Sequence, residues 1–481
     1  MAFDMSALKA HYGDRIYTDS VNEVQNGCVL MVNLGAQDAI VAAGVSGFHG
    51  AAVESWLECP LDHENAETLR KLFPFAAPQR ILGRDKTMGV GDRLGICTPG
   101  HIRAFRAYPQ ITPVFAQQSI RELTLTNRTF DDVLDCASFA VYREGFKTGF
   151  GADGDHLKTA SEVEYALSRH YTMITLDCSE HIHGEINDEN CDALYTSMPE
   201  LEAIYLDRSF DIGEGCTVHF DAHEFHKTAL IYAEAVQFAA KIYHDLIESP
   251  EGDRADFEMS IDETATPTTP AQHFFVANEF KRLGVHTCTV APRFCGEFQK
   301  GIDYKGDLKQ FEAELKVHAA IARHFGYKLS IHSGSDKFSV FPYIGRETQG
   351  RFHLKTAGTN WLQAMLLIAD CEPELYREVH AYALTVFNEA TKYYHVTTDL
   401  NRIPALDSLT DAQLPELFKN EDSRQLIHIT YGLILNAKDE GGKFRFRDRL
   451  FEAWRAHEET LSAHVATHIE RHMKLILGEE V

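Results

Sequence analysis

The chain has 481 residues, of which 44% are hydrophobic and 24% are charged. This composition is typical of a folded globular protein and excludes disordered, collagen-like and coiled-coil chains. With 46 basic and 71 acidic residues, the formal net charge is −25, and such a surface repels nucleic acids and anionic membranes. We therefore expect no nucleic-acid or membrane partner.

The cysteines and the N-terminal residues favour a cytoplasmic location. The ten cysteines are scattered without a CxxC pair, which indicates reduced thiols and not a zinc ribbon or redox motif. Residues 1–15 lack a signal-peptide pattern, and the apolar stretch 29–45 is interrupted by Asn33, Gln37 and Asp38, which argues against a membrane span. The 25 histidines are numerous for this length and direct attention to metal ligands.

Residues 1–140 combine short apolar runs with many Gly and Pro turns, and we interpret them as an N-terminal extension that completes the fold. From about residue 145, strand patterns alternate with helix patterns. The expected elements in chain order are a strand ending near Phe150, a helix over 160–170, a strand over 171–177, a helix over 223–247, a strand over 257–262, a helix opened by Thr269-Pro270 and ended by Gly284, a strand over 285–290, a helix capped by Asp307 and ended by Gly326, and a strand over 327–332.

This alternation predicts a parallel sheet with covering helices. Because five strand–helix units follow one another in about 190 residues, it favours a TIM-barrel-like (β/α) barrel over residues 141–400. An open, doubly wound sheet is the alternative. Residues 401–481 are expected to be a helical C-terminal region that covers the barrel or serves an interface.

Barrel enzymes carry their chemistry at the carboxyl ends of the strands. Acids, histidines and cations recur at these ends in the predicted sheet. They are Asp153, Asp155 and His156 after the first predicted strand, Asp177 at the second, Asp262 and Glu263 at the third, residues 291–300 after the fourth, and His332 at the fifth.

Alternation within the strands indicates which side chains face the barrel interior. Glu258 and Asp262 lie opposite to the apolar residues of their strand, and His332 lies opposite to Leu329 and Ile331. Desolvation in the interior is expected to raise the pKa of Glu258 and to suit it to general acid catalysis. A structural carboxylate paired with a barrel Arg or Lys is the alternative.

His156 and His332 are the best candidate metal ligands, because neutral imidazoles at two strand ends can converge on one ion. The third ligand is expected from the loop after the fourth strand, where Glu297 and Gln299 offer oxygen donors. Asp155 is interpreted either as a catalytic base or as part of a Gly-flanked Asx turn.

Other polar groups give weaker signals. Arg293, Lys300 and Lys337 are cations near the predicted site, where they either hold an anionic substrate or are solvated. His223-Glu-Phe-His226 differs in spacing from HExxH and is interpreted as helix-start capping. Residues 89–95 lack the spacing of a dinucleotide loop.

Four stretches together resemble the tagaturonate epimerase family: residues 89–95 with 98–101, 149–158, 291–301 and 330–337. The resemblance implies an isomerase of hexuronate catabolism that interconverts D-tagaturonate and D-fructuronate with one divalent cation. The ligand set suits Zn²⁺, Mn²⁺, Co²⁺ or Ni²⁺, and the sequence does not choose among them. The partner is then a small anionic sugar acid, whereas the oligomeric state is not readable.

The resemblance also implies roles for single residues. It makes Asp155 the proton acceptor, Glu258 the proton donor, and the metal ligands His156, Gln299 and His332. The sequence does not identify the basic residue that binds the substrate carboxylate, for which we expect Arg293.

The two ketohexuronates differ at a carbinol carbon one step beyond the carbon next to the ketone. Enolisation cannot invert that carbon, so we expect retro-aldol cleavage and re-addition in preference to oxidation by a bound nicotinamide. The alternatives are a ketohexose 4-epimerase or aldose–ketose isomerase for neutral sugars, a metallohydrolase, and a sugar-acid binding protein without catalytic activity.

Overall fold

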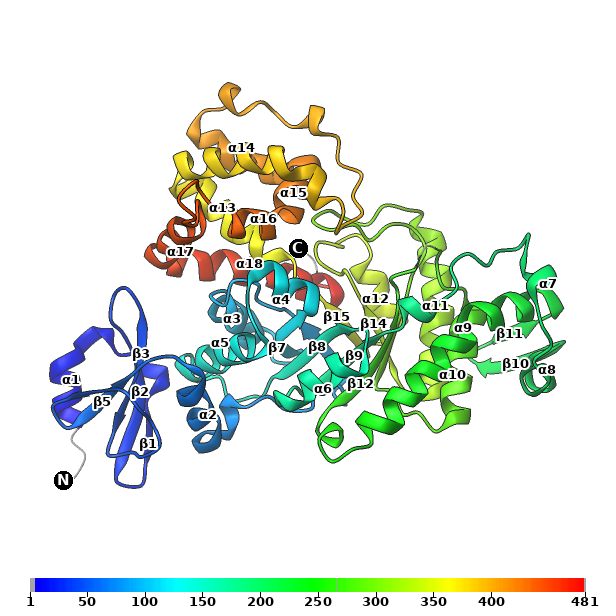
Figure 1. Ribbon diagram of the computed structural model, residues 1–481, viewed down its shortest axis with the longest axis horizontal. Coiled ribbons are helices and arrows are strands. Elements are labelled where there is room, and N and C mark those ends of the chain that lie inside the picture. The colour runs from blue at the N-terminus through cyan, green and yellow to red at the C-terminus, as the bar shows by residue number, and fades with distance from the viewer. Residues whose placement is uncertain (1–4, 265, 480–481) are drawn as a thin grey trace.

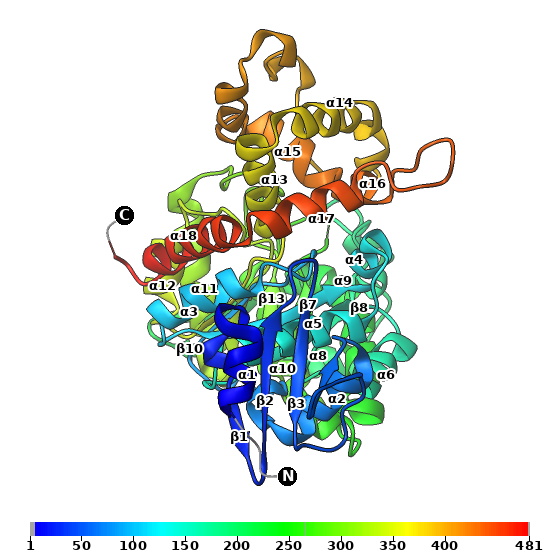
Figure 2. The same cartoon turned by 90° about the vertical axis from the view of Figure 1, so that its left-hand side faces the viewer.

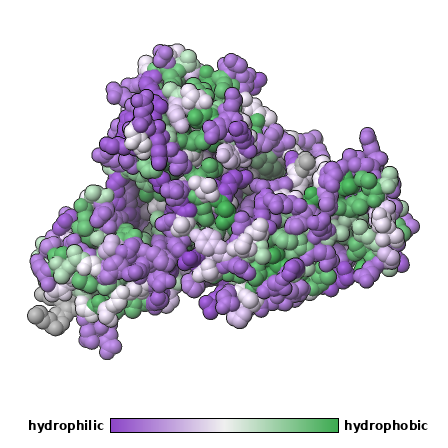
Figure 3. All heavy atoms as spheres, in the orientation of Figure 1, coloured by the Kyte–Doolittle hydropathy of each residue, from purple (hydrophilic) through white to green (hydrophobic). Residues whose placement is uncertain are grey.

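A computed structural model describes residues 5–264 and 266–479. A central barrel is flanked on one side by an N-terminal sheet and covered at one end by C-terminal helices (Figures 1 and 2). Hydrophilic residues cover most of the face drawn in Figure 3, in keeping with the net charge of −25. Among the described residues, no helix has both the length and the apolar character needed to cross a membrane.

The predicted (β/α) barrel is confirmed. Eight parallel strands close in the order β12-β13-β14-β15-β6-β7-β8-β9, so that strands adjacent along the chain are adjacent in the barrel. The strands are β6 Lys86–Gly89, β7 Thr112–Ser119, β8 Gly151–Leu157, β9 Met173–Asp177, β12 Asp256–Ile261, β13 Thr289–Pro292, β14 Lys328–Ile331 and β15 Phe352–Lys355.

Two strands of the barrel come from the segment that was interpreted as an N-terminal extension. β6 and β7 lie within residues 1–140, so the barrel begins at Lys86 and not near residue 141. β15 was also not foreseen. β6 and β15 have four residues each, and β7 ends in Gln-Gln-Ser, so none presents a long alternating or apolar pattern. The strand expected to end near Phe150 instead begins at Gly151.

Helices cover the barrel, and several begin where the sequence predicts. Thr159, Thr269 and Asp307 each cap a helix through backbone N–H groups, and Gly284 ends one in the left-handed conformation at φ 74°. The helices that follow the strands are α3 Thr98–Ala107, α4 Ile120–Thr126, α5 Phe130–Arg143, α6 Ala160–Ser168, α9 Ala222–Ile242, α10 Pro270–Leu283, α11 Leu308–Phe325, α12 Phe341–Glu347 and α13 Thr359–Cys371.

A long connection between β9 and β12 extends from the barrel at the right-hand edge of Figure 1. It begins after Asp177 and leads into α9, which returns the chain to the barrel. Besides α9 it comprises α7 Cys191–Leu194, α8 Pro199–Tyr205 and a hairpin of β10 Arg208–Gly213 and β11 Cys216–Phe220.

The N-terminal part is a five-stranded antiparallel sheet in the order β1-β2-β3-β5-β4. Residues of β2 are buried on both faces, which explains the apolar run seen in the sequence. One face packs against α1 and the other against α2 and α5. The elements are α1 Met5–Tyr12, β1 Asn22–Val24, β2 Gly27–Asn33, β3 Asp38–Ala43, β4 Ala51–Val53, β5 Trp56–Cys59 and α2 His63–Leu72.

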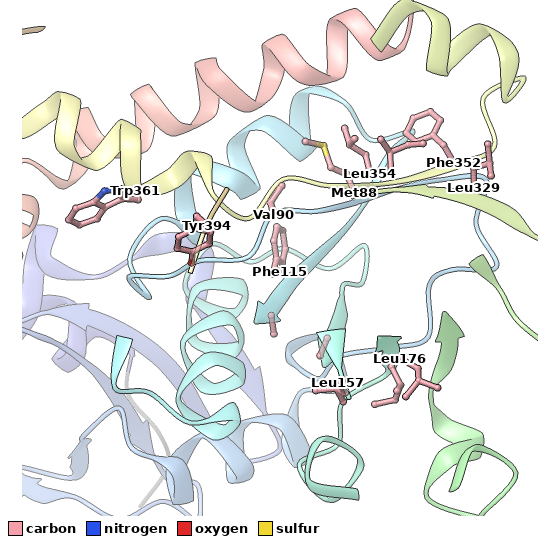
Figure 4. Close-up of a cluster of buried hydrophobic side chains, with 14 of the residues drawn as sticks. Met88, Val90, Phe115, Leu157, Leu176, Leu329, Phe352, Leu354, Trp361 and Tyr394 are labelled. Atoms are coloured by element: carbon pink, nitrogen blue, oxygen red, sulfur yellow. The ribbon is translucent and has the colours of Figure 1, made fainter. Parts of the chain in front are cut away.

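The C-terminal helices pack over the barrel, and α18 lies along α3 and α13 (Figure 2). Met88, Phe352 and Leu354 fill the layer between the barrel strands and these helices, whereas Trp361 lies beyond the barrel (Figure 4). The indole N–H of Trp361 donates to the carbonyl of Ile427 at 2.7 Å. The remaining helices are α14 Pro373–Ala390, α15 Glu421–Ile429, α16 Tyr431–Asn436, α17 Arg447–Ala456 and α18 Glu458–Ile476.

His380 of α14 gives the folded state a defined pH dependence. It is fully buried, and neither ring nitrogen has a hydrogen-bond partner among the described residues. Burial lowers its pKa to about 4, whereas an unfolded histidine titrates near 6.5. Below that pH, the His380 imidazole therefore binds more protons in the unfolded state than in the folded state. The free energy of unfolding decreases as the pH falls.

We expect the wild-type protein to lose about 2 kcal/mol more free energy of unfolding between pH 8 and pH 5 than the His380→Leu variant. Urea denaturation at several pH values measures this difference. Parallel pH profiles for the two proteins would contradict the assignment.

Candidate functional site

The carboxyl end of the barrel contains a buried layer of charged side chains. Glu258 of β12 has no exposed surface, and its carboxylate lies 2.7 Å from Nε2 of His332 and 2.8 Å from Nζ of Lys355. The hydroxyl of Thr289 donates to its second oxygen at 2.5 Å. Glu258 therefore lies in the barrel interior, where alternation along its strand places it.

The protonation of Glu258 differs from the expectation. Burial alone raises the pKa of this carboxyl, but Lys355 and His332 outweigh burial and hold the pKa well below its usual range. The prediction of a raised pKa was therefore wrong, and Glu258 is paired with a barrel lysine, as the alternative interpretation proposes.

Lys355 is the central residue that the sequence analysis missed. Its ammonium lies 2.9 Å from Asp153, 2.7 Å from Asp155 and 2.8 Å from Glu258. Burial lowers the pKa of Lys355, but these three carboxylates raise it well above its usual value. The sequence feature that could have identified Lys355 is the alternation Phe352-His-Leu-Lys355, which places the lysine on the polar face at a strand end.

Asp153 and Asp155 lie within strand β8 and not in a turn, so the Asx-turn interpretation was wrong. Two residues apart, they point to the same side and meet Lys355. Burial raises the pKa of Asp153 to about 7, against the opposing effect of Lys355. The pKa of Asp155 is held well below its usual range, because Lys355 and His156 outweigh burial.

His156 faces the same site because strand β8 contains an irregularity. Its pairing with β9 shifts between Gly154 and Leu157, which admits one extra residue, and His156 has φ 51°. Such a bulge re-aims a side chain at the end of a strand. Nδ1 of His156 lies 2.8 Å from the adjacent carboxylate of Asp155.

The structure brings His156, His332 and Asp262 together. The two imidazole centroids are 4.9 Å apart, and Oδ1 of Asp262 lies 3.0 Å from Nδ1 of His332 and 3.7 Å from Nε2 of His156. One donor atom from each of the three residues lies within 4.8 Å of the others. The two histidines predicted as metal ligands thus meet, with Asp262 as a further oxygen donor.

Gln299 lines the same cavity as His332 and Asp262. Its side-chain oxygen accepts hydrogen bonds at 3.0 Å from the N–H and hydroxyl of Thr397 and from the amide of Gln425. In this arrangement the oxygen is engaged by the C-terminal region and not by the histidines. Glu297 lies on the wall of the same cavity.

The cavity has a volume of about 510 Å³ and opens above His332. Arg121, Arg293 and Lys300 line it. Arg293 donates to the backbone carbonyl of Thr264, whereas Arg121 stacks over Tyr394 with its guanidinium 5.1 Å from the ring centre. A smaller adjoining cavity, also lined by Arg121 and Lys300, reaches Asp155, His156 and Lys355.

Lys337 and Asp177 make contacts that stabilise the loops and a strand end near the site. Lys337 is buried and donates to the carbonyls of Gln299, Ile302 and Ser335 at 2.7–2.9 Å, so it holds the loops after β13 and β14 together. Asp177 accepts the N–H of Ser179 at 2.8 Å at the end of β9.

Comparisons with known proteins agree with this fold and with the resemblance seen in the sequence. A family model described as tagaturonate epimerase matches residues 17–476. A tagaturonate/fructuronate epimerase from Thermotoga maritima is 40% identical, over 98% of this chain and 100% of the relative.

Solved structures give the same result. The crystal structure of fructuronate-tagaturonate epimerase from Cohnella laeviribosi with one glycerol is 46% identical, with a TM-score of 0.95, over 98% of this chain and 99% of that one. The native structure of that enzyme has the same identity and TM-score and covers 98% of each chain. The full-length matches of sequence and structure show that this chain belongs to the tagaturonate epimerase family and is an isomerase.

Proposed function

We propose that this chain interconverts D-tagaturonate and D-fructuronate at the carboxyl end of its barrel. The observation that carries the proposal is the arrangement of Asp155 and Glu258 on either side of Lys355, next to the His156–His332 pair. The Thermotoga maritima and Cohnella laeviribosi relatives are named for this activity, and the identity to them extends over nearly the whole chain.

The residues at this end of the barrel suit a divalent cation. His156 and His332 would supply imidazole nitrogens, and Asp262 and Gln299 offer oxygens at the same cavity. Two imidazoles with oxygen donors fit Zn²⁺, Mn²⁺, Co²⁺ or Ni²⁺. When bound, such a cation would polarise the substrate carbonyl and stabilise negative charge on its oxygen. To bind it, Gln299 would have to release Thr397 or Gln425.

The carboxylates of the chain can move the protons that a retro-aldol reaction requires. Asp155, kept ionised by Lys355, would accept the proton of the hydroxyl on the carbon to be inverted. The bond from that carbon to its neighbour next to the ketone then breaks, which leaves an aldehyde and an enolate. Re-addition of the enolate to the opposite face of the aldehyde re-forms the bond with inverted configuration.

The alkoxide formed on re-addition needs a proton, for which Glu258 is the proposed donor. Because Lys355 and His332 keep Glu258 ionised beforehand, Glu258 would first receive the proton that Asp155 accepted. Because Lys355 contacts both Asp155 and Glu258, the proton taken up in cleavage stays within one hydrogen-bonded network. Asp153, with a pKa of about 7, is a third carboxyl group that can hold a proton at neutral pH.

Arg121 and Lys300 are better placed than Arg293 to bind the substrate carboxylate. Nε of Arg121 is buried without a hydrogen-bond partner among the described residues, and Nη2 of Arg121 lies 3.7 Å from the carboxylate of Glu263. Nζ of Lys300 lies 3.1 Å from the hydroxyl of Ser333. These two cations border both the main cavity and the smaller one that reaches Asp155.

Removal of divalent metal should lower the conversion of D-fructuronate to D-tagaturonate by at least about a hundredfold, because the carbonyl is no longer polarised. NMR of the reaction after chelation, and after single divalent ions are added back, measures this loss and its recovery. His332→Ala is the matched variant and should not recover. Unchanged turnover by metal-free protein would contradict the metal proposal. If no ion gives turnover, the uronate assignment fails and neutral ketohexoses become the substrates to test.

Deuterium on the epimerised carbon should be retained in the product made in ordinary water, since the proposed bond cleavage does not remove that hydrogen. Mass spectrometry and NMR of the isolated ketohexuronate report its position. Exchange of this deuterium with solvent hydrogen would exclude the retro-aldol route.

Arg121→Gln should raise KM for D-fructuronate by about ten- to a hundredfold, since a charge-assisted contact to the carboxylate is lost. Arg293→Gln serves as the comparison and should change KM less. Steady-state kinetics on both variants decide the assignment. A larger increase of KM in Arg293→Gln would instead assign the binding of the substrate carboxylate to Arg293.

A further inference from the structure

A second cluster of metal-binding side chains lies in the connection between β9 and β12. Cys191 and Asp192 come from α7, and His223 and His226 come from the first turns of α9. Sγ of Cys191 lies 3.6 Å from Nδ1 of His223, and the two oxygens of Asp192 lie 2.8 Å from Nδ1 of His223 and of His226. α7 is at the edge of the molecule in Figure 1. None of the four residues lines the catalytic cavity.

The two histidines do not cap the helix, contrary to the sequence interpretation. Asp221 is the N-cap of α9, and its side chain accepts the N–H of Glu224 at 2.8 Å. His223 and His226 are three residues apart, so they project from the same side of the helix. That side faces α7, where Cys191 is fully buried.

The distances suit a tetrahedral zinc site. A thiolate sulfur and an imidazole nitrogen on the same zinc ion are about 3.5 Å apart, close to the separation between Cys191 and His223. Ligands of one zinc ion are wider apart than 2.8 Å, and the short contacts of Asp192 are those of hydrogen bonds from the histidines.

The surroundings of the cluster match what zinc sites require. Nε2 of His223 lies 3.3 Å from Asp188, a carboxylate that would orient the imidazole while Nδ1 binds the ion. Lys227 pairs with Asp188 at 2.7 Å, which leaves Asp192 to the histidines. One thiolate and one carboxylate also balance the charge of a divalent ion, to which a neutral imidazole adds none.

We propose that Cys191, Asp192 and His223, whose donor atoms lie within 4.8 Å of one another, bind a Zn²⁺ ion that fastens α7 to α9, with His226 adjacent on the same side of the helix. The thiolate makes the site selective for zinc or cobalt over Mg²⁺ and Mn²⁺. The ion fixes the connection that follows β9, in which α7 is a single turn with Cys191 as its buried residue. This site is independent of the proposed catalytic metal, whose donors include no sulfur.

Reconstitution of the chelated full-length protein with Co²⁺ tests the proposal, because only a cysteine ligand gives a thiolate-to-cobalt charge-transfer band. We expect this band in the wild-type protein, together with one metal equivalent that persists in His332→Ala. Cys191→Ser should lose the band and that equivalent, and Zn²⁺ should abolish the band by competition. Cys216→Ser, in the neighbouring hairpin, is the matched control and should keep the band.

His223→Gln provides a second test should Cys191→Ser fold poorly, since it removes a nitrogen ligand and leaves the thiol. It should weaken Co²⁺ binding at this site by at least about tenfold, measured from the charge-transfer band. Absence of the band in the wild-type protein, or its presence in Cys191→Ser, would overturn the proposal. Failure of the catalytic proposal leaves this result unaffected, because the readout does not depend on turnover.

Discussion

One ammonium group, that of Lys355, holds together the charged interior of the barrel. Asp153, Asp155 and Glu258 come from β8 and β12 and would repel one another without it. Breaking a buried ion pair by removal of one partner costs about 3–5 kcal/mol, and here three carboxylates share the partner. The positions of the acids and their protonation therefore depend on the same side chain.

A second constraint joins the C-terminal helices to the loops that surround the site. Gln299 is held by Thr397 and Gln425, and its backbone carbonyl is held by Lys337. In the loop after β14, Asp336 contacts Arg424 of α15 at 2.9 Å and His468 of α18 at 2.8 Å. Because these contacts bridge distant parts of the chain, the C-terminal helices hold the loops around the cavity in place and are not only a cover.

The sequence alone predicts the barrel and the elements with strong local signals. The caps at Thr269 and Asp307 and the strand of Glu258 follow from residue patterns that need no distant partner. β15 and Lys355 were missed, although β13 and β14, which are as short, were predicted. The same omission reversed the expected pKa of Glu258, since the dominant charge comes from a strand far away in sequence. The contact of Gln299 with Thr397 depends on tertiary packing and could not be predicted from the sequence either.

The extra residue in β8 places two consecutive side chains on the same side of a strand, where a regular strand would point them apart. An acid and an imidazole are thereby fixed relative to each other by the covalent backbone between Asp155 and His156. Loops around the cavity can rearrange without altering that separation. Deletion of a single residue at this position would point one of these two side chains away from the site, toward the wall of the barrel. The length of β8 therefore matters as much as its composition.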